Sequence, residues 1–122
     1  MHQPVMLEEA LMWLAIQPNG IYVDGTVGGG GHSRAILQRL GAAGRLIGID
    51  CDPRAIERQA PDPRATWLVG NFRHLGALLA QARASQVHGV LLDLGVSSYH
   101  LDDPGRGFSY RQEGPLDMRL GS

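Results

Sequence analysis

A run of glycines beside an acidic residue is the part of the sequence best suited to hold a ligand. Gly28, Gly29, Gly30 and Gly31 follow Asp24 closely, directly after an apolar segment at 21–23. Glycines have no Cβ, so a ligand can approach the backbone, and they adopt positive φ where a turn needs it. A turn that only reverses the chain needs one or two glycines. The run therefore predicts a ligand-binding loop, with a simple turn as the alternative.

The residues around the glycines favour one class of ligand. In a dinucleotide site, the pattern G-x-G-x-x-G opens a helix whose N-terminal amides receive a pyrophosphate. Here the last required glycine would fall at Ser33. A carboxylate at Asp24 would repel a pyrophosphate but favour a ligand with an ammonium and a sulfonium group. S-adenosylmethionine is such a ligand, and a nicotinamide dehydrogenase is the nearest enzymatic alternative.

A second acidic site ends the next apolar segment. Asp50 follows Leu46–Ile49 at the strand-helix-strand spacing at which a carboxylate meets ribose hydroxyls in nucleotide-binding sheets. Asp52 followed by Pro53 is typical of a helix start, because Asp caps helices and Pro suits the first helical position. We therefore expect Asp50 to bind the ribose. Cys51, between the two acids, is interpreted as a small buried thiol, with a position beside an adenine edge as the alternative.

Helical and strand patterns alternate along the chain and predict an α/β fold with a parallel sheet covered by helices on both faces. Strand ends in such a sheet meet at one edge, where ligands bind. Asp24, Asp50, Phe72 and Asp93 all follow predicted strands, and Phe72 packs either on a purine or in the core. The predicted elements are a helix at 5–16, strand 21–23, helix 32–40, strand 45–49, a short helix from 53, strand 66–69, helix 72–84 and strand 87–92.

The segment from Leu94 to Tyr110 has little helical or strand period. It interleaves aromatic residues and arginines with Gly and Pro. Aromatics and arginines in a loop can stack a single-stranded base and hold its phosphates. Because long irregular loops in compact domains are usually functional or disordered, we predict an irregular functional loop here, with a solvated surface loop as the alternative.

Composition limits the class of protein. A chain of 122 residues can bury one core, and its formal net charge of −1 gives no global attraction to nucleic acid. The eleven basic residues are all arginine, which fits RNA contact but is explained more simply by a GC-rich genome. One cysteine excludes an internal disulfide, and the scattered histidines predict no metal site. Without an apolar run of membrane-spanning length or a signal-peptide pattern, we expect a cytoplasmic protein with no membrane partner.

Seven blocks of residues occur in order along nearly the whole chain. They are His2-x-Pro4-Val5-Met6-Leu7-x-Glu9, Asp24-Gly25-Thr26-x-Gly28-x-Gly30-Gly31-His32-Ser33, Gly48-Ile49-Asp50-x-Asp52-Pro53, Gly70-Asn71-Phe72, Asp93-Leu94-Gly95-Val96-Ser97-Ser98, Arg106-Gly107-Phe108-Ser109 and Gly114-Pro115-Leu116-Asp117-Met118-Arg119. Together they resemble one family, the bacterial small-subunit (16S) ribosomal RNA cytosine-N4 methyltransferases (RsmH, formerly MraW). The glycine loop alone indicates only a Rossmann-like class I methyltransferase, whereas the later blocks are specific to the family.

The resemblance implies transfer of a methyl group from S-adenosylmethionine to the exocyclic amine of a cytidine in the decoding region of 16S ribosomal RNA, within the small ribosomal subunit. His100 stands where many relatives carry glutamine, and either side chain can form a hydrogen bond. By the resemblance, the cofactor contacts fall on Gly30, Gly31, His32, Asp50, Phe72, Asp93 and His100.

The resemblance does not assign a catalytic residue. Many amine methyltransferases carry an Asp/Asn-Pro-Pro-aromatic segment after the fourth strand, and the segment at 93–96 here lacks the prolines and the aromatic. If Asp93 serves the cofactor, then Asp102, Asp103 and Asp117 are the candidate acceptors for the amine proton.

Members of the family run to more than twice this length and add a helical insertion and further strands. We therefore expect residues 1–122 to be the cofactor-binding part of a single methyltransferase domain, truncated after its fourth strand. A fragment that binds cofactor or RNA without turnover is the alternative.

Overall fold

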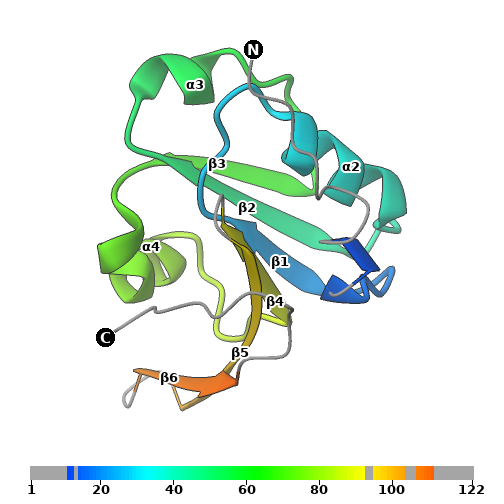
Figure 1. Cartoon of the computed structure of the whole chain (residues 1–122), viewed down its shortest axis with the longest axis vertical. Coiled ribbons are helices and arrows are strands. Elements are labelled where there is room, and N and C mark those ends of the chain that lie inside the picture. The colour runs from blue at the N-terminus through cyan, green and yellow to red at the C-terminus, as the bar shows by residue number, and fades with distance from the viewer. Residues whose placement is uncertain (1–10, 13, 93–94, 104–106, 112–122) are drawn as a thin grey trace.

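The computed structural model describes residues 11–12, 14–92, 95–103 and 107–111, and in the last two ranges it describes the backbone alone. Its elements alternate as the sequence predicts (Figure 1). They are β1 (Ile21–Asp24), α2 (Gly31–Arg39), β2 (Arg45–Asp50), α3 (Pro53–Glu57), β3 (Ala65–Val69), the 3-10 helix η1 (Phe72–His74), α4 (Leu75–Gln81), β4 (Gly89–Leu92), β5 (Gly95–Asp103) and β6 (Gly107–Arg111).

The strands form one sheet in the order β3-β2-β1-β4-β5-β6. The four strands from β3 to β4 are parallel, which confirms the predicted sheet. The chain first moves outward from β1 through β2 to β3, and then returns to place β4 on the other side of β1. This change of direction puts a topological switch point between β1 and β4, where open α/β sheets bind their ligands beyond the carboxyl ends of the strands.

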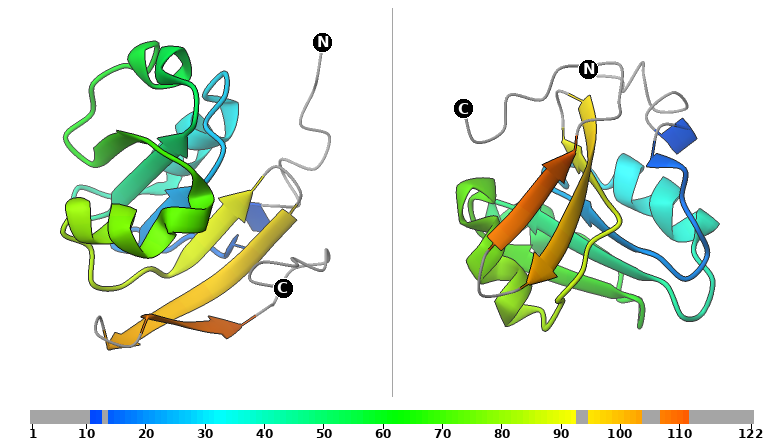
Figure 2. Two further views of the ribbon diagram at one scale, coloured as in Figure 1. Left: turned by 90° about the vertical axis from the view of Figure 1, so that its left-hand side faces the viewer. Right: turned by 90° about the horizontal axis from the view of Figure 1, so that it is seen from below.

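Successive side chains of the central strands point to opposite faces of the sheet and pack into two hydrophobic cores, one on each face. Val23 and Ile47 lie in the cluster that contains the apolar residues of α4. Tyr22 and Leu46, their neighbours in sequence, lie in the cluster that contains Ile36 of α2. Figure 2 shows α2 and α4 on opposite sides of the sheet. Helices on both faces, as predicted, therefore hold the central strands in place.

The sequence predicted the presence of these helices more accurately than it predicted where they begin and end. The helix expected at 72–84 is divided into η1 and the shorter α4, which ends at Gln81. Of the helix expected at 5–16, Leu11, Met12 and Leu14 are helical, and both leucines are buried in the α2-side core. Residues 5–10 of that prediction lie outside the described residues. Among the described residues, no helix is long and apolar enough to cross a membrane.

The prediction of an irregular loop at 94–110 is wrong. β5 pairs antiparallel with β4, and β6 pairs antiparallel with β5, so the sheet continues beyond its fourth strand. The pairing register shifts between His100 and Asp103, which interrupts the simple alternation that would have marked a strand in the sequence. Two runs separated by a short segment with Pro104 and Gly105 are a hairpin pattern. Where the structure describes this segment, at 95–103 and 107–111, its backbone thus belongs to strands of the sheet.

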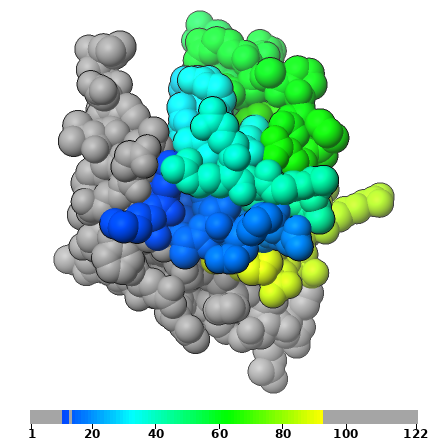
Figure 3. Space-filling view, turned by 90° about the vertical axis from the view of Figure 1, so that its right-hand side faces the viewer, coloured from blue at the N-terminus to red at the C-terminus, as the bar shows by residue number. Residues whose placement is uncertain are grey.

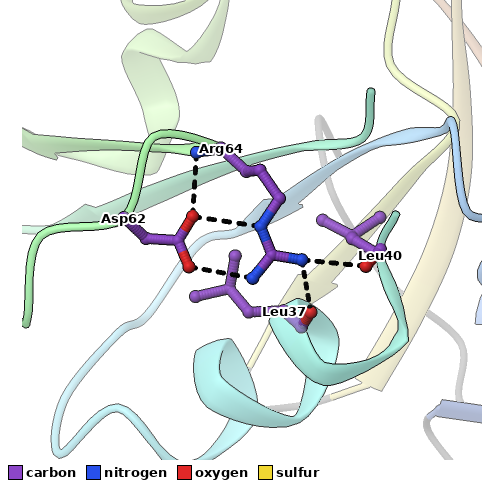
Figure 4. Close-up of polar contacts among 4 residues, drawn as sticks. All are labelled: Leu37, Leu40, Asp62 and Arg64. Atoms are coloured by element: carbon purple, nitrogen blue, oxygen red, sulfur yellow. Dashed lines mark hydrogen bonds and ion pairs between the residues drawn. The ribbon is translucent and has the colours of Figure 1, made fainter. Parts of the chain in front are cut away.

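Arg64 links the C-terminal end of α2 to the segment that precedes β3 through hydrogen bonds. Its Nη1 donates to the carbonyl oxygens of Leu37 and Leu40, each at 2.8 Å, and so satisfies two of the free carbonyls that end the helix (Figure 4). Its Nε and Nη2 donate to the two carboxylate oxygens of Asp62 at 3.0 and 2.8 Å. The paired guanidinium lowers the pKa of Asp62 to about 2.

The turn after α2 is held against the segment that leads into β1. Gly41 donates its backbone N–H to the carbonyl of Pro18, and Arg45 donates to that of Gly20. Figure 3 looks at this amino edge of the sheet, where the end of α2 and the segment before β1 lie side by side. Arg45 also donates from Nη2 to the carbonyl of Ala82, so this edge is tied together by arginine bonds to backbone oxygens.

Candidate cofactor site at the carboxyl edge

The loop between β1 and α2 crosses the carboxyl ends of the neighbouring strands. Gly25 donates its N–H to the carbonyl of Leu91 in β4 at 2.8 Å, and Val27 donates to Ile49 in β2 at 3.1 Å. The loop then turns back on itself through a 2.8 Å bond from the N–H of Gly30 to the carbonyl of Val27. The predicted ligand loop therefore lies at the switch point.

Two glycines of this loop have left-handed backbone. Gly28 has φ +53° and Gly30, the residue that precedes α2, has φ +92°. Side chains other than glycine rarely adopt these angles. At Gly28, Gly29 and Gly31, a Cβ would meet no atom within 4 Å, so open space lies over the backbone there. Backbone that is open at these three glycines is what the sequence predicted for a loop that receives a bulky ligand.

Asp24 lies beneath the loop and is only 1% exposed. Its Oδ2 accepts a 2.6 Å hydrogen bond from the hydroxyl of Ser33, and its Oδ1 accepts from the backbone N–H of Thr26 at 3.1 Å. Burial raises the pKa of Asp24, against the opposing effect of the two hydrogen bonds. We expected the carboxylate of Asp24 to attract a cationic ligand, but its hydrogen bonds go to Thr26 in the loop and to Ser33 in the first turn of α2.

Asp50 stands across the loop from Asp24, at the end of β2. Its Oδ2 accepts from the N–H of Gly28 at 2.8 Å, and its Oδ1 accepts from the N–H of Asp52 at 2.9 Å. The side chain is half-buried, and a carboxylate has about four lone-pair positions. Acceptor capacity therefore remains for ribose hydroxyls, and the ribose contact stays a prediction.

Phe72 lies at the rim of the loop. A Cβ built on Gly25 would come 2.9 Å from Cδ1 of the Phe72 ring, so ring and loop backbone are in close contact. The ring is half-buried and packs against the α4-side core. Phe72 is therefore partly a core residue, and its ring contacts the loop at Gly25.

The interpretations of the two neighbours of Asp50 had different outcomes. Asp52 is the N-cap of α3, with Oδ1 accepting from the N–H of Arg54 at 2.9 Å and Pro53 in the first turn, which confirms the capping prediction. Cys51 is exposed, so the prediction of a buried thiol is wrong. The polypeptide turns outward directly after Asp50 to begin α3, and this turn carries residue 51 away from the core.

The structure brings together only some of the remaining predicted cofactor contacts. Gly30, Gly31 and His32 lie together at the start of α2, with His32 half-buried. Asp93 lies outside the described residues, as does the candidate acceptor Asp117. The cofactor contact predicted for Asp93 stays a prediction.

The direction of β5 places the backbone of His100. Gly95 pairs with Leu92, and Ser97 pairs with Val90, so β5 runs from the carboxyl edge toward the amino edge. The backbone of His100 lies farther along this course, and the candidate acceptors Asp102 and Asp103 end the strand. The structure does not bring these three backbones to the glycine loop, and their predicted roles stay predictions.

Sequence reasoning missed Ser33 as a functional candidate. We considered it only as the position where a dinucleotide motif would need glycine, whereas its hydroxyl holds Asp24. A small hydroxyl residue in the first turn of a helix, shortly after a strand-ending acid, was the available signal. The bond from Gly28 to Asp50 left no such signal, because it involves a backbone group.

A hollow at the opposite edge of the sheet is a poorer candidate for the cofactor site. It measures about 490 Å³ and is lined by residues 40–45, 63 and 64. The guanidinium groups of Arg45 and Arg64 beside it donate to backbone carbonyls and to Asp62. Among the described residues, no group of three or more His, Cys, Asp or Glu side chains is arranged to hold a metal ion.

Comparison with known proteins agrees with the geometry. A model of the MraW methylase family matches residues 1–122. Two proteins named ribosomal RNA small subunit methyltransferase H are similar to the chain. The one from Burkholderia ambifaria is 54% identical over 121 residues, covering 98% of this chain and 39% of the relative. The one from Heliobacterium modesticaldum is 49% identical over 125 residues, covering 98% and 40%. The chain thus spans about two fifths of the length of these relatives.

Solved structures share the fold at low identity. A candidate rRNA methylase from Clostridium thermocellum superposes with a TM-score of 0.58 at 16% identity, over 74% of this chain and 50% of the other. A protein-L-isoaspartate O-methyltransferase gives a TM-score of 0.56 at 11% identity, over 99% and 48%. The fold is that of class I S-adenosylmethionine-dependent methyltransferases.

Proposed function

Because this chain belongs to the MraW methylase family, we propose that it is the cofactor-binding part of an S-adenosylmethionine-dependent ribosomal RNA methyltransferase. The observation that carries the proposal is the loop between β1 and α2. Its backbone at Gly28, Gly29 and Gly31 faces open space, and it lies at the switch point beside two carboxylates. The residues of the loop fit the cofactor, because backbone that is open at Gly28, Gly29 and Gly31 can receive its methionine part.

Each residue around the loop has a distinct task in this proposal. Asp50 accepts hydrogen bonds from the ribose hydroxyls while its Oδ2 also holds the N–H of Gly28. The exposed part of Phe72 packs against the adenine, and His32 borders the methionine end from the first turn of α2. A cofactor held at these points has its sulfonium methyl oriented, and orientation alone supplies a large part of the acceleration in a transfer between two bound groups.

The acceptor that we propose is the N4 amine of a cytidine in the decoding region of 16S ribosomal RNA. The bound cofactor supplies an electrophilic methyl group. The N4–C bond forms as the C–S bond breaks, S-adenosylhomocysteine leaves, and one amine proton passes to an acceptor on the protein or to water. The names of the relatives support ribosomal RNA as the substrate class. Asp93 and His100 belong to the cofactor contacts of this proposal through the family pattern.

The proposal is tested in two steps. Equilibrium dialysis of the 122-residue chain against S-adenosylmethionine and against NAD should show binding of the first ligand only. Preferential binding of NAD would favour a nicotinamide enzyme instead and would remove the methyltransferase assignment.

The second step measures transfer of labelled methyl to small-subunit ribosomal RNA, beside the complete Burkholderia ambifaria relative. We expect the relative to label cytidine N4 and the 122-residue chain to do so far more slowly. Label on another base or another atom would overturn the cytidine N4 assignment.

A further inference from the structure

The carboxylate beneath the glycine loop and the hydroxyl that bonds to it form an isolated polar pair. Tyr22 aside, Asp24 and Ser33 are the two buried polar side chains among the residues whose side chains the structure describes, 1% and 0% exposed. Their 2.6 Å bond joins the last residue of β1 to the first turn of α2. Everything between these two points is the loop that we propose to bind the cofactor.

Such a pair is an expensive way to stabilise a fold. Removing a carboxylate from water costs free energy, and replacing a buried polar pair by apolar residues of similar volume is often neutral or stabilising. The raised pKa of Asp24 is the sign of that cost. The pair is therefore better explained by the geometry that it imposes on the loop.

The geometry is imposed at three points. Asp24 holds the N–H of Thr26 at the start of the loop and the hydroxyl of Ser33 at its end. Asp50 holds the N–H of Gly28 between them. The backbone at 29–31, which is open at Gly29 and Gly31, thus lies between positions that are fixed by hydrogen bonds.

We propose that Ser33 is a positioning residue, and that the Asp24–Ser33 hydrogen bond presents the glycine loop and the start of α2 to the methionine part of the cofactor. In this role Asp24 acts by holding the loop, while its charge contributes little attraction to the ligand. The inference rests on the proposed function, because it assumes that the loop binds S-adenosylmethionine.

Two ligands separate positioning from attraction. S-adenosylmethionine and S-adenosylhomocysteine differ by the methyl group and by the positive charge on sulfur. Loss of positioning weakens both ligands equally, whereas loss of a nearby negative charge weakens S-adenosylmethionine more.

The test is isothermal titration calorimetry of both ligands with the full chain. For Ser33→Ala we expect both affinities to fall about tenfold, the lower range for a hydrogen bond to a charged group. Ser33→Thr keeps the hydroxyl and should restore affinity. Asp24→Asn should bind within about threefold of the unchanged chain, because the carboxamide can accept from Thr26 and donate to Ser33. Ser85→Ala, at an exposed serine before β4, is the matched control and should change neither affinity.

The outcomes distinguish the inference from the function on which it rests. If the unchanged chain binds neither ligand, the proposed function fails. If it binds both and Ser33→Ala binds them equally well, the positioning role is overturned. A loss confined to S-adenosylmethionine in Asp24→Asn would also overturn it, by showing that the charge acts directly. Thermal melts identify the folded fraction of each variant, and Asp24→Asn keeps the test decisive where Ser33→Thr fails to fold.

Discussion

Asp62 and Asp24, at the two edges of this sheet, have pKa values that are shifted in opposite directions. At the amino edge, Arg64 binds two carbonyls of α2 and both oxygens of Asp62, and this pairing lowers the pKa of Asp62 to about 2. At the carboxyl edge, burial raises the pKa of Asp24, Gly28 and Gly30 have left-handed backbone, and open space lies over Gly28, Gly29 and Gly31. At the amino edge, the polar groups form bonds that stabilise the fold. At the carboxyl edge, they hold a loop in a conformation that stability alone would not select.

This difference implies a division of labour. Changes at the carboxyl edge should alter ligand affinity more than the free energy of unfolding, and changes at the amino edge should do the reverse. Active sites commonly carry strain and costly burial that the rest of the fold supports. Variants at matched positions on the two edges test this difference.

The largest effect is expected from Gly30→Val. The backbone at φ +92° is strained for a residue with a side chain, by roughly 1–3 kcal/mol, and a Cβ there would lie 2.5 Å from Oε1 of Gln59. The loop must shift, and S-adenosylmethionine binding should fall below detection in calorimetry while a cooperative thermal transition remains. Gly76→Ala, in α4 with open space around its Cβ, is the control and should bind normally. Normal binding by Gly30→Val would mean that the loop is only a turn.

A smaller loss is expected from Asp50→Ala. Charge-assisted hydrogen bonds to the ribose contribute roughly 1.5–3 kcal/mol, so affinity for S-adenosylmethionine should fall about tenfold to a hundredfold. Asp52→Ala removes the neighbouring carboxylate, which caps α3, and should cost about 1 kcal/mol of stability with little change in affinity. Equal affinities in these two variants, measured by calorimetry on folded protein, would falsify the ribose assignment.

At the amino edge, Arg64→Ala should reverse the pattern. The variant leaves the carbonyls of Leu37 and Leu40 and the carboxylate of Asp62 without their guanidinium partner. We expect the midpoint of thermal unfolding to fall by several degrees, while the folded variant binds S-adenosylmethionine within about twofold of the unchanged chain. Arg83→Gln, at an exposed arginine of the same edge, should leave both quantities unchanged. Loss of affinity in Arg64→Ala at full folding would show that the edges are coupled.

The smallest effects are opposite pH dependences of stability. The pKa of Asp62 is lowered from 3.8 to about 2, so this carboxylate stabilises the fold above pH 3.8, and the stabilisation is lost as the pH falls toward 2. The pKa of Asp24 is raised above 3.8, so its proton is bound more tightly in the folded state, and the stability that it contributes is present below pH 3.8 and lost as the pH rises.

Asparagine substitutions isolate these two contributions. Asp62→Asn should be less stable than the unchanged chain at pH 7, with a difference that shrinks toward pH 2. Asp24→Asn should be at least as stable as the unchanged chain at pH 7, and this advantage should disappear in acid. Urea unfolding at pH 7, 5 and 3 measures both, and parallel pH profiles for the two variants would contradict the comparison.

Much of the fold could be predicted from residue patterns. Strand-ending acids and the apolar segments before them located β1 and β2, and the Asp52-Pro53 pair located the start of α3, because these signals are local. The hairpin of β5 and β6 was missed, because its pairing with β4 is a long-range contact and its register shift breaks the alternation of a strand. Tertiary pairing overrode a sequence that is rich in Gly, Pro and Asp.

The candidate site was predicted in outline but not in its internal bonds. The glycine loop could be found because glycine is needed wherever side chains must be absent. Asp50 could be found because an acid ends an apolar segment there, at the spacing of a ribose contact. The partners of the carboxylates could not, since Asp24 binds a hydroxyl in the next helix and Asp50 binds a backbone N–H. A sequence shows which groups can accept a hydrogen bond, and only the fold selects the donor.

Titration of the nitrogen-15-labelled chain with S-adenosylmethionine, followed amide by amide in NMR spectra, tests most directly whether the ligand binds at the carboxyl edge alone. We predict shifts at Gly28, Gly29, Gly31, His32 and Asp50, and unchanged amides at residues 41–45 and at Asp62 and Arg64. Shifts centred on the amino edge, or no shifts at millimolar ligand, would contradict the assignment of the glycine loop as the cofactor site.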